Sequence, residues 1–324
     1  MENLVLSFNI IAPLLLYMLI GAFLTKIGIV TDEFRMRMNK LIVKLIIPCN
    51  ICRNLYTADL SNMLKAVYVP YAVLTNMAFF FAFYFISKSF IKDPARLGSF
   101  VQGTTRGNAV IFGIPLCESV FGVGTPEMAL TLAVLVPYYN TFEIVMIEAC
   151  GQKAEAARNG AEAGNLKINW KRLGKKLITN GILWGVFLGL VINFIKLPIP
   201  EFADTVVNGI GKCVSPLSFM MAGSAFSFKA AKKDSTLLAI ATFTKLVLIP
   251  GIFMILPIMW GWKDEVLLAM LVAFATPTAI SSYPMAKAAG CDGQLASEIV
   301  AFTTGLSMFS IFIWIFCFKS FGLL

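Results

Sequence analysis

The sequence predicts an all-α polytopic membrane protein, and three observations lead to this fold class. Hydrophobic residues make up 58% of the 324 residues, well above the roughly 45–50% that is usual in soluble domains. Apolar runs of about 20 residues recur along the chain, and each is long enough to cross the hydrocarbon core as a helix. Pro, Gly and polar residues interrupt several of these runs at similar places in the two halves.

Ten spans are predicted, with short connections between most of them. In the first half they cover residues 4–30, 38–55, 63–91, 97–121 and 127–150, and in the second half 177–195, 202–226, 237–260, 266–290 and 294–318. No Lys or Arg precedes the first run, which is longer than the apolar region of a signal peptide. We therefore expect this run to remain as a span and no targeting segment to be cleaved.

Helix breakers recur at a nearly constant offset between the two halves. The offsets are 168, 170 and 169 residues for the pairs Pro48 and Pro216, Asn108 and Thr278, and Pro115 and Pro284. Because each half has an odd number of spans, the second half enters the membrane from the opposite side, and the repeat is inverted. We therefore predict a first five-helix repeat (1–150), a polar linker (151–175) and a second five-helix repeat (176–324).

Basic residues are divided unevenly between the two sides of the membrane. The first side holds 17, namely Lys26, Arg35, Arg37, Lys88, Lys92, Arg96, Lys153, Arg158, Lys167, Lys171, Arg172, Lys175, Lys176, Lys229, Lys232, Lys233 and Lys287. The other side holds 5, namely Arg53, Lys65, Lys196, Lys263 and Lys319. The positive-inside rule makes the first side cytoplasmic, so the linker is expected in the cytoplasm and both termini outside a plasma membrane.

The fourth span contains a stretch that cannot be an uninterrupted, lipid-facing helix. Gly107 weakens helical order and Asn108 favours an N-cap, so we expect the helix to stop there and to restart with Asn108 as the cap, and Pro115 is a further breaker of the span. The unpaired N–H groups at such a break must face protein or a polar cavity. The N-terminus of the second half-helix carries a partial positive charge that suits an anion.

The ninth span is predicted to break in the same way. Thr276 can cap a helix and Pro277 suits its first position, so a second half-helix is expected to begin there, and Pro284 is a further breaker. Broken helices at equivalent positions of inverted repeats meet near the midplane of the membrane, where transporters bind their substrates. The two breaks are therefore the predicted binding site.

Arg106, two residues before the first break, is charged and lies at membrane depth. Burying it costs at least about 2.5–3.5 kcal/mol on insertion scales, so it needs a partner or a wet cavity. Its guanidinium could bind a substrate carboxylate bidentately. Alternatively, it could form a salt bridge, for which Glu143 is the nearest candidate by depth, or snorkel along its own span. The residues alone leave these roles open.

No cofactor is predicted. Cys49 and Cys52 form a C-x-x-C pair, but no second pair accompanies them and the chain has no His, so a metal or redox site is not expected. The Gly-x-x-x-x-Gly-Lys-Ser/Thr motif is absent, so ATP-driven transport by this chain alone is not expected. The net charge of +9 is spread over many loops instead of forming a patch, so nucleic acid is not expected as a partner.

Three motifs resemble the auxin efflux carrier family, which includes plant auxin exporters and bacterial carriers linked to malate and malonate. They are the run from Gly107 to Leu116, the segment Pro137-Tyr138-Tyr139-Asn140, and Pro277-Thr278 leading to Ala286-Lys287-Ala288-Ala289-Gly290. The resemblance extends over essentially the whole chain. It implies an elevator-like carrier in which spans 1, 2, 6 and 7 form a scaffold and the broken spans 4 and 9 cross within a moving domain.

The expected activity is secondary transport of a small organic anion, such as a mono- or dicarboxylate. Plant members tend to have Pro where this chain has Gly107, and their linkers are much longer, so auxin is not the expected substrate. The candidate substrate-binding residues are Asn50, Arg106, Gly107, Asn108, Tyr138 or its neighbour Tyr139, Asn140, Pro277 and Thr278. Membrane lipid is a further expected partner, and the sequence is compatible with either a monomer or a homodimer.

Two other classes of function remain open. A sodium-coupled bile-acid-type carrier or a cation/proton carrier would share the crossed helices, but it would need acidic ligands at the crossing, where none is expected. A membrane sensor or enzyme would need an appended domain or a nucleophile beside a base, and the sequence shows neither. We therefore predict that the protein is not an enzyme.

Overall fold

The computed structural model describes residues 2–58, 67–159, 175, 178–225 and 235–324. All regular secondary structure in these residues is helical, which confirms the all-α prediction. Five helical stretches are long and apolar enough to cross a membrane: Asn3–Lys26, Tyr68–Phe90, Pro126–Arg158, Ser235–Met259 and Gly293–Ser320. These stretches correspond to the predicted first, third, fifth, eighth and tenth spans.

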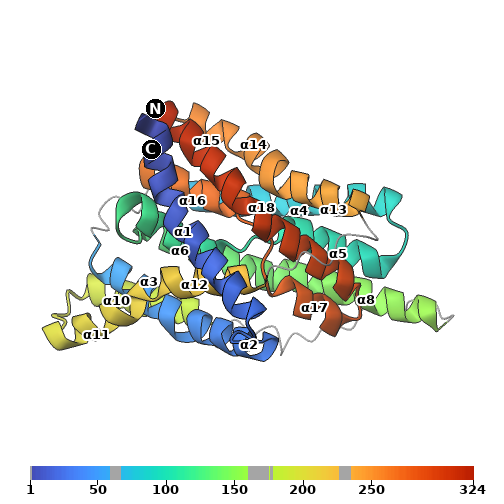
Figure 1. The fold of residues 1–324 in the computed structure, drawn as a ribbon, viewed down its shortest axis with the longest axis horizontal. Helices are drawn as coiled ribbons and strands as arrows, with labels where there is room; N and C mark the ends of the chain where they lie inside the picture. Colours follow the sequence, from blue (N-terminus) through green and yellow to red (C-terminus); the bar gives the residue numbers. More distant parts are fainter. Residues whose placement is uncertain (1, 59–66, 160–174, 176–177, 226–234) are drawn as a thin grey trace.

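The helices of the first half are numbered in chain order, and Figure 1 labels most of them. They are α1 (Glu2–Lys26), α2 (Asp32–Leu41), the π-helical segment η1 (Ile42–Ile46), α3 (Ile47–Tyr56), α4 (Tyr68–Phe90), α5 (Pro94–Thr105), α6 (Ala109–Phe121), α7 (Pro126–Tyr138), the π-helical segment η3 (Tyr139–Glu143) and α8 (Ile144–Arg158). Helix α8 includes residues 151–158 of the predicted linker, and residues 160–174 of that linker lie outside the described residues.

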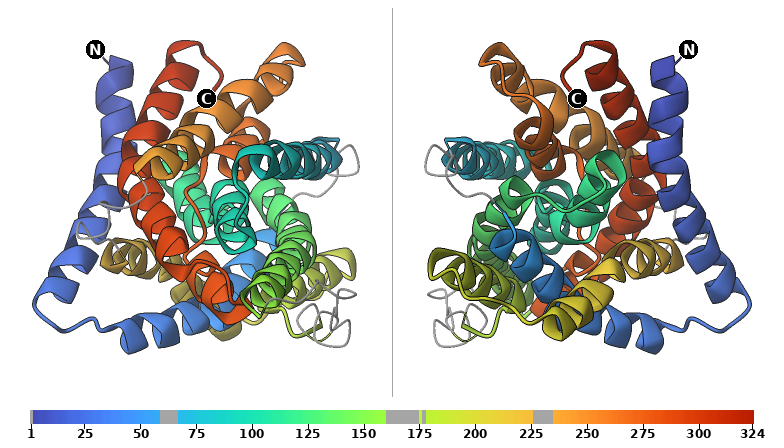
Figure 2. Two further views of the ribbon diagram at one scale, coloured as in Figure 1. Left: turned by 90° about the vertical axis from the view of Figure 1, so that its right-hand side faces the viewer. Right: turned by 90° about the vertical axis from the view of Figure 1, so that its left-hand side faces the viewer.

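The second half follows the same pattern of long and interrupted helices. It contains α10 (Gly181–Phe194), α11 (Glu201–Lys212), α12 (Val214–Ser224), α13 (Ser235–Phe243), the π-helical segment η5 (Thr244–Leu248), α14 (Ile249–Phe253), α15 (Ile255–Met259), α16 (Asp264–Ala275), α17 (Ser282–Ala289) and α18 (Gly293–Ser320). The N- and C-termini lie at the same end of the molecule (Figures 1 and 2), where Asn3 Nδ2 donates to Lys319 O at 3.4 Å.

Proline explains the π-helical segment η5. Pro250 has no N–H, so the carbonyl of Leu246, four residues earlier, loses its usual partner in the helix. Two side chains of α18 donate to that carbonyl instead, Ser310 Oγ at 2.7 Å and Trp314 Nε1 at 3.4 Å. The widened turn is therefore held from outside the helix, and it changes the direction of the side chains that it carries.

Glycines allow two helix pairs to pack with their backbones in contact. A Cβ atom added to Gly21 of α1 would lie 1.9 Å from the carbonyl oxygen of Met220 in α12. One added to Gly185 of α10 would lie 2.7 Å from the carbonyl oxygen of Pro48 in α3. Small residues at such crossings are typical of helix packing in membranes, where there is little hydrophobic force between helices.

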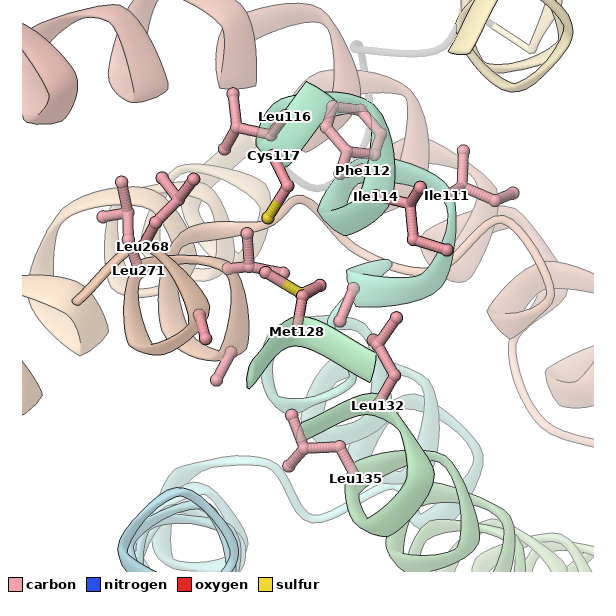
Figure 3. Close-up of a cluster of buried hydrophobic side chains, with 14 of the residues drawn as sticks. Ile111, Phe112, Ile114, Leu116, Cys117, Met128, Leu132, Leu135, Leu268 and Leu271 are labelled. Carbon is pink, nitrogen blue, oxygen red and sulfur yellow. The ribbon is translucent and has the colours of Figure 1, made fainter. Parts of the chain in front are cut away.

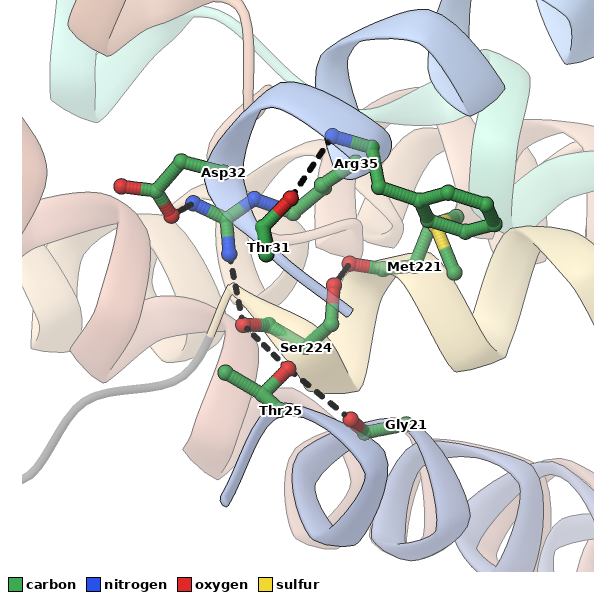
Figure 4. A network of polar contacts seen from close by, with 8 residues as sticks. Gly21, Thr25, Thr31, Asp32, Arg35, Met221 and Ser224 are labelled. Atoms are coloured by element: carbon green, nitrogen blue, oxygen red, sulfur yellow. Dashed lines mark hydrogen bonds and ion pairs between the residues drawn. The ribbon is translucent and has the colours of Figure 1, made fainter. Parts of the chain in front are cut away.

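A polar network fixes the turn between α1 and α2 against α12 (Figure 4). Thr31 caps α2 by accepting from the N–H of Phe34 at 3.2 Å. Arg35 donates to the carbonyl oxygen of Ser224 at 2.7 Å and pairs with Asp32. The end of α12 therefore has a partner for one of its free carbonyl groups.

Apolar side chains of α6, α7 and α16 form the part of the core shown in Figure 3. Every residue from Leu267 to Ala275 of α16 is buried, so this helix is surrounded by protein on all sides. Helix α16 therefore runs through the centre of the molecule. Its C-terminal residue, Ala275, is also buried by the surrounding helices.

Candidate functional site

The two predicted breaks meet, and their backbones pair. Helix α5 ends at Thr105 and α6 begins at Ala109, while α16 ends at Ala275 and α17 begins at Ser282. The N–H of Asn108 donates to Pro277 O at 2.7 Å, and the N–H of Ala279 donates to Arg106 O at 3.1 Å. The bridge between Gly107 and Thr278 is antiparallel. Each break thus supplies hydrogen-bond partners for backbone groups that the other leaves open.

Asn108 is the N-cap residue of α6, but the way in which it caps differs from the prediction. Its carbonyl accepts from the N–H of Phe112 at 3.1 Å, while its side chain makes no capping bond. The residue is buried, and its Nδ2 has no hydrogen-bond partner. The amide is therefore free to bind a ligand at the break.

The second break differs more from its prediction. Thr276 ends α16 instead of starting α17, and its hydroxyl donates back to Val272 O at 2.9 Å. The residue before a proline is forced into extended backbone, so Pro277 makes Thr276 stop the helix. The next helix starts at Ser282, so the prediction that it begins at Pro277 was wrong.

The two remaining prolines do not break helices. Pro115 lies inside α6, which continues through it to Phe121, so the predicted interruption there is wrong. Pro284 lies in the first turn of α17, where the helix needs no N–H from it. The irregular backbone of both spans is therefore confined to the paired segments.

Arg106 binds the π-helical segment η3. Its Nη1 donates to Tyr139 O at 3.1 Å and lies 3.6 Å from Glu143 Oε2, and its Nη2 donates to Asn140 Oδ1 at 3.1 Å. Among the roles considered for Arg106, the structure shows the salt bridge to Glu143. Asn140 lies at the break, where it orients this guanidinium.

Glu143 places a carboxylate directly beside the break. It is fully buried, and its Oε1 accepts from Thr105 Oγ1, at the end of α5, at 3.1 Å. The expectation that no acid would lie at the crossing is therefore wrong. The reason is that η3 runs past the end of α5, which the spacing of residues along the chain does not show.

Lys245 is a site residue that sequence reasoning missed. It is fully buried in η5, and its Nζ donates to Thr105 O at 3.2 Å. A Cβ atom on Gly107 would lie 3.4 Å from this Nζ and 3.2 Å from the hydroxyl of Tyr139, so Gly107 leaves room for both groups. The sequence does contain a signal for this residue, which is a lysine in the middle of an apolar run. Placing a charged side chain in a membrane costs free energy, so such a lysine indicates a functional site.

Thr278 is buried and held by two other helices. Its N–H donates to Thr303 Oγ1 of α18 at 3.1 Å, and its hydroxyl donates to the carbonyl oxygen of Gly103 in α5. Its side chain therefore joins the two halves of the chain. We call the paired segments 106–108 and 277–279 the junction. Helix α18, on which no site residue was predicted, also contacts it.

Two predicted site residues lie away from the junction. The hydroxyl of Tyr138 donates to Asn76 O of α4 at 3.1 Å, so Tyr139 and not Tyr138 is the tyrosine beside Gly107. Asn50 Nδ2 donates to Glu118 Oε1 at 2.9 Å. Glu118 is ten residues beyond Asn108 in α6, about 15 Å along the helix axis, so Asn50 does not reach the break.

Comparison with known proteins gives a consistent result. A relative from Methanothermobacter thermautotrophicus, described as an uncharacterized transporter, is 20% identical over 309 residues, which cover 95% of this chain and 97% of the relative. Another uncharacterized transporter, from Methanocaldococcus jannaschii, is 23% identical over 316 residues, covering 94% and 97%. The family model described as "Membrane transport protein" matches residues 6–315. The chain therefore belongs to this membrane transport protein family, the auxin efflux carrier family that its motifs predicted.

Proposed function

We propose that this transporter is a secondary carrier that moves a small organic anion across the plasma membrane at the junction of its two breaks. The observation that carries this proposal is the pairing of residues 106–108 with residues 277–279. Beside this pairing lie the N-terminus of α6, whose partial charge is positive, and the free amide of Asn108. Gly107, Thr278, Pro277, Asn140 and Arg106 border the same junction, so they belong to the proposed site.

We further propose ten spans in two inverted repeats, with broken spans 4 and 9 crossing. Helix packing supports this arrangement. Helix α1 of the first span packs on α12 of the seventh, and α10 of the sixth span packs on α3 of the second. In an inverted repeat, span 1 corresponds to span 6 and span 2 corresponds to span 7. The contact between spans 1 and 7 in the first pair is therefore equivalent to the contact between spans 6 and 2 in the second pair.

The two packed pairs would form the static part of an elevator. Within each pair, α1 with α12 and α3 with α10, the helices contact through glycines and backbone, which favours a rigid pair. The junction lies among the remaining helices, which would carry the anion as they move. Glu118, bound by Asn50 of α3 and Ser215 of α12, lies between the two parts.

Uptake into proteoliposomes tests the transport activity. We expect purified protein to accumulate radiolabelled carboxylates, with malate, malonate and lactate as probes, faster than liposomes without protein. Their neutral amides should not compete, because the site is proposed to recognise the charge. Failure to take up any carboxylate, with the protein folded, would remove the support for an organic-anion carrier.

The alternatives predict different results. A carrier of cations would need Glu143 as a ligand, but that carboxylate already faces Arg106 and Lys245, so a cation would have to displace both. Cation flux that is independent of carboxylates would favour this alternative. A membrane sensor would bind carboxylates without moving them.

Orientation is a separate prediction. The division of basic residues places the linker in the cytoplasm and both termini outside. In a variant without native cysteines, a cysteine introduced at Asn159 should resist an impermeant thiol reagent in intact cells, whereas one introduced at Leu324 should react. Both should react after the cells are opened. Labelling of position 159 but not 324 in intact cells would show that the topology is reversed.

A further inference from the structure

Three buried charges lie together at the junction, and they do not cancel. Arg106 and Lys245 are basic residues, Glu143 is acidic, and all three are buried. Lys245 interacts electrostatically with Glu143, which also interacts with Arg106. One carboxylate thus faces two cations. Glu298, the other charged side chain that is buried among the described residues, accepts from Gln294 Nε2 of its own helix at 3.0 Å.

The two cations differ in how their partners are arranged. Arg106 has a carboxylate, an amide oxygen and a carbonyl oxygen within reach of its two Nη atoms. Lys245 has a hydrogen bond to the carbonyl of Thr105, which carries no formal charge. The guanidinium is therefore occupied by protein, and the ammonium is the charge that lacks a carboxylate of its own.

A buried charge without a counterion is costly in a low-dielectric interior, and an anion placed next to it removes much of that cost. The absence of a side chain at Gly107 lets the ammonium approach the break, because a Cβ atom there would lie 2.8 Å from Thr276 Oγ1 and 3.4 Å from Lys245 Nζ. The next residue, Asn108, holds an amide donor without a partner. A cation, a free N–H donor and the N-terminus of α6 thus occur together at one break.

We propose that Lys245 is the counterion of the transported anion and that the site takes one ionised carboxylate at a time. This inference rests on the proposed function and narrows its substrate class to monoanions. A second ionised carboxylate on the same ligand would meet Glu143 instead of another free cation. Arg106 and Glu143 act as a positioning pair that holds η3 against the break.

Ligands of nearly equal size and different charge test this assignment. Malonate, its monoamide malonamate and its diamide malonamide carry two, one and no carboxylates, and lactate with lactamide gives a second pair. We expect the wild type to bind malonamate and lactate at least tenfold more tightly than the neutral amides, and malonamate more tightly than malonate. Binding is read from thermal stabilisation of the purified protein and from competition for uptake.

Lys245→Met removes the charge and keeps the length of the side chain. It should lose the preference for monoanions over amides, and its unfolding temperature without ligand should be unchanged or higher, because an unpaired charge has gone. Lys245→Gln should behave in the same way and serves if the Met variant does not fold. The matched control is Lys212→Met, an exposed lysine of α11, which should keep the wild-type preference.

The outcomes separate the two proposals. If the wild type transports carboxylates and both Lys245 variants keep its preference for monoanions, Lys245 is not the counterion, while the carrier function stands. If malonate binds more tightly than malonamate, the restriction to one ionised carboxylate is wrong. If the wild type binds and transports none of these acids, the proposed function fails and the assignment of Lys245 fails with it.

Discussion

Asn108→Ala and Pro277→Ala are each expected to abolish transport while leaving the protein folded. Asn108 Nδ2 has no partner in the protein, so its removal breaks no internal hydrogen bond. A hydrogen bond to a charged ligand contributes about 1.5–3 kcal/mol, so its loss should weaken binding by about ten- to a hundredfold and abolish uptake at substrate concentrations well below the weakened Kd. Pro277→Ala acts on the backbone, because Thr276 is then no longer forced to be extended and α16 can continue into the break.

Initial uptake rates in proteoliposomes measure this effect, with thermal unfolding of the same samples as a check on folding. Pro115→Ala is the matched control for proline, because Pro115 lies where α6 is continuous. It should transport at close to the wild-type rate. If both Asn108→Ala and Pro277→Ala also transport at that rate, the junction is not the site of transport.

Of the substitutions proposed for this protein, Glu143→Gln is expected to lower the free energy of unfolding most. The carboxylate is fully buried and faces both Arg106 and Lys245. Removing one partner of a buried ion pair typically costs about 3–5 kcal/mol, because the remaining charge is left without compensation. Here two cations would be left. Thermal unfolding in detergent should show the loss as a lower midpoint.

A double-mutant cycle separates the ion pair from other effects of the substitution. Glu143→Gln combined with Arg106→Gln should recover part of the lost stability, because one uncompensated charge has gone as well. Glu118→Gln is the matched control, since this carboxylate accepts from Asn50 and Ser215. It should lower the midpoint less. Strictly additive losses for Glu143 and Arg106 would contradict the assigned pair.

The family could be predicted from the sequence because its signals are local. Apolar runs predicted helices, and the described residues contain five that are long enough to span a membrane. Gly107 followed by Asn108, and Thr276 followed by Pro277, predicted the two interruptions because these residues act on their own backbone. The inverted repeat led to the expectation that the two interruptions lie close together, and backbone hydrogen bonds join them in the structure.

The sequence by itself thus determined that the chain is helical, where two of its helices stop and to which family it belongs. Only the tertiary structure decided which side chains surround the junction. Lys245 lies 140 residues from Thr105, and Glu143 lies 38 residues from it, yet both bind it. Both belong to π-helical segments, in which an extra residue per turn rotates every following side chain away from the position that a regular α-helix predicts. The direction of those side chains, and therefore the charge of the site, depends on how these widened turns pack.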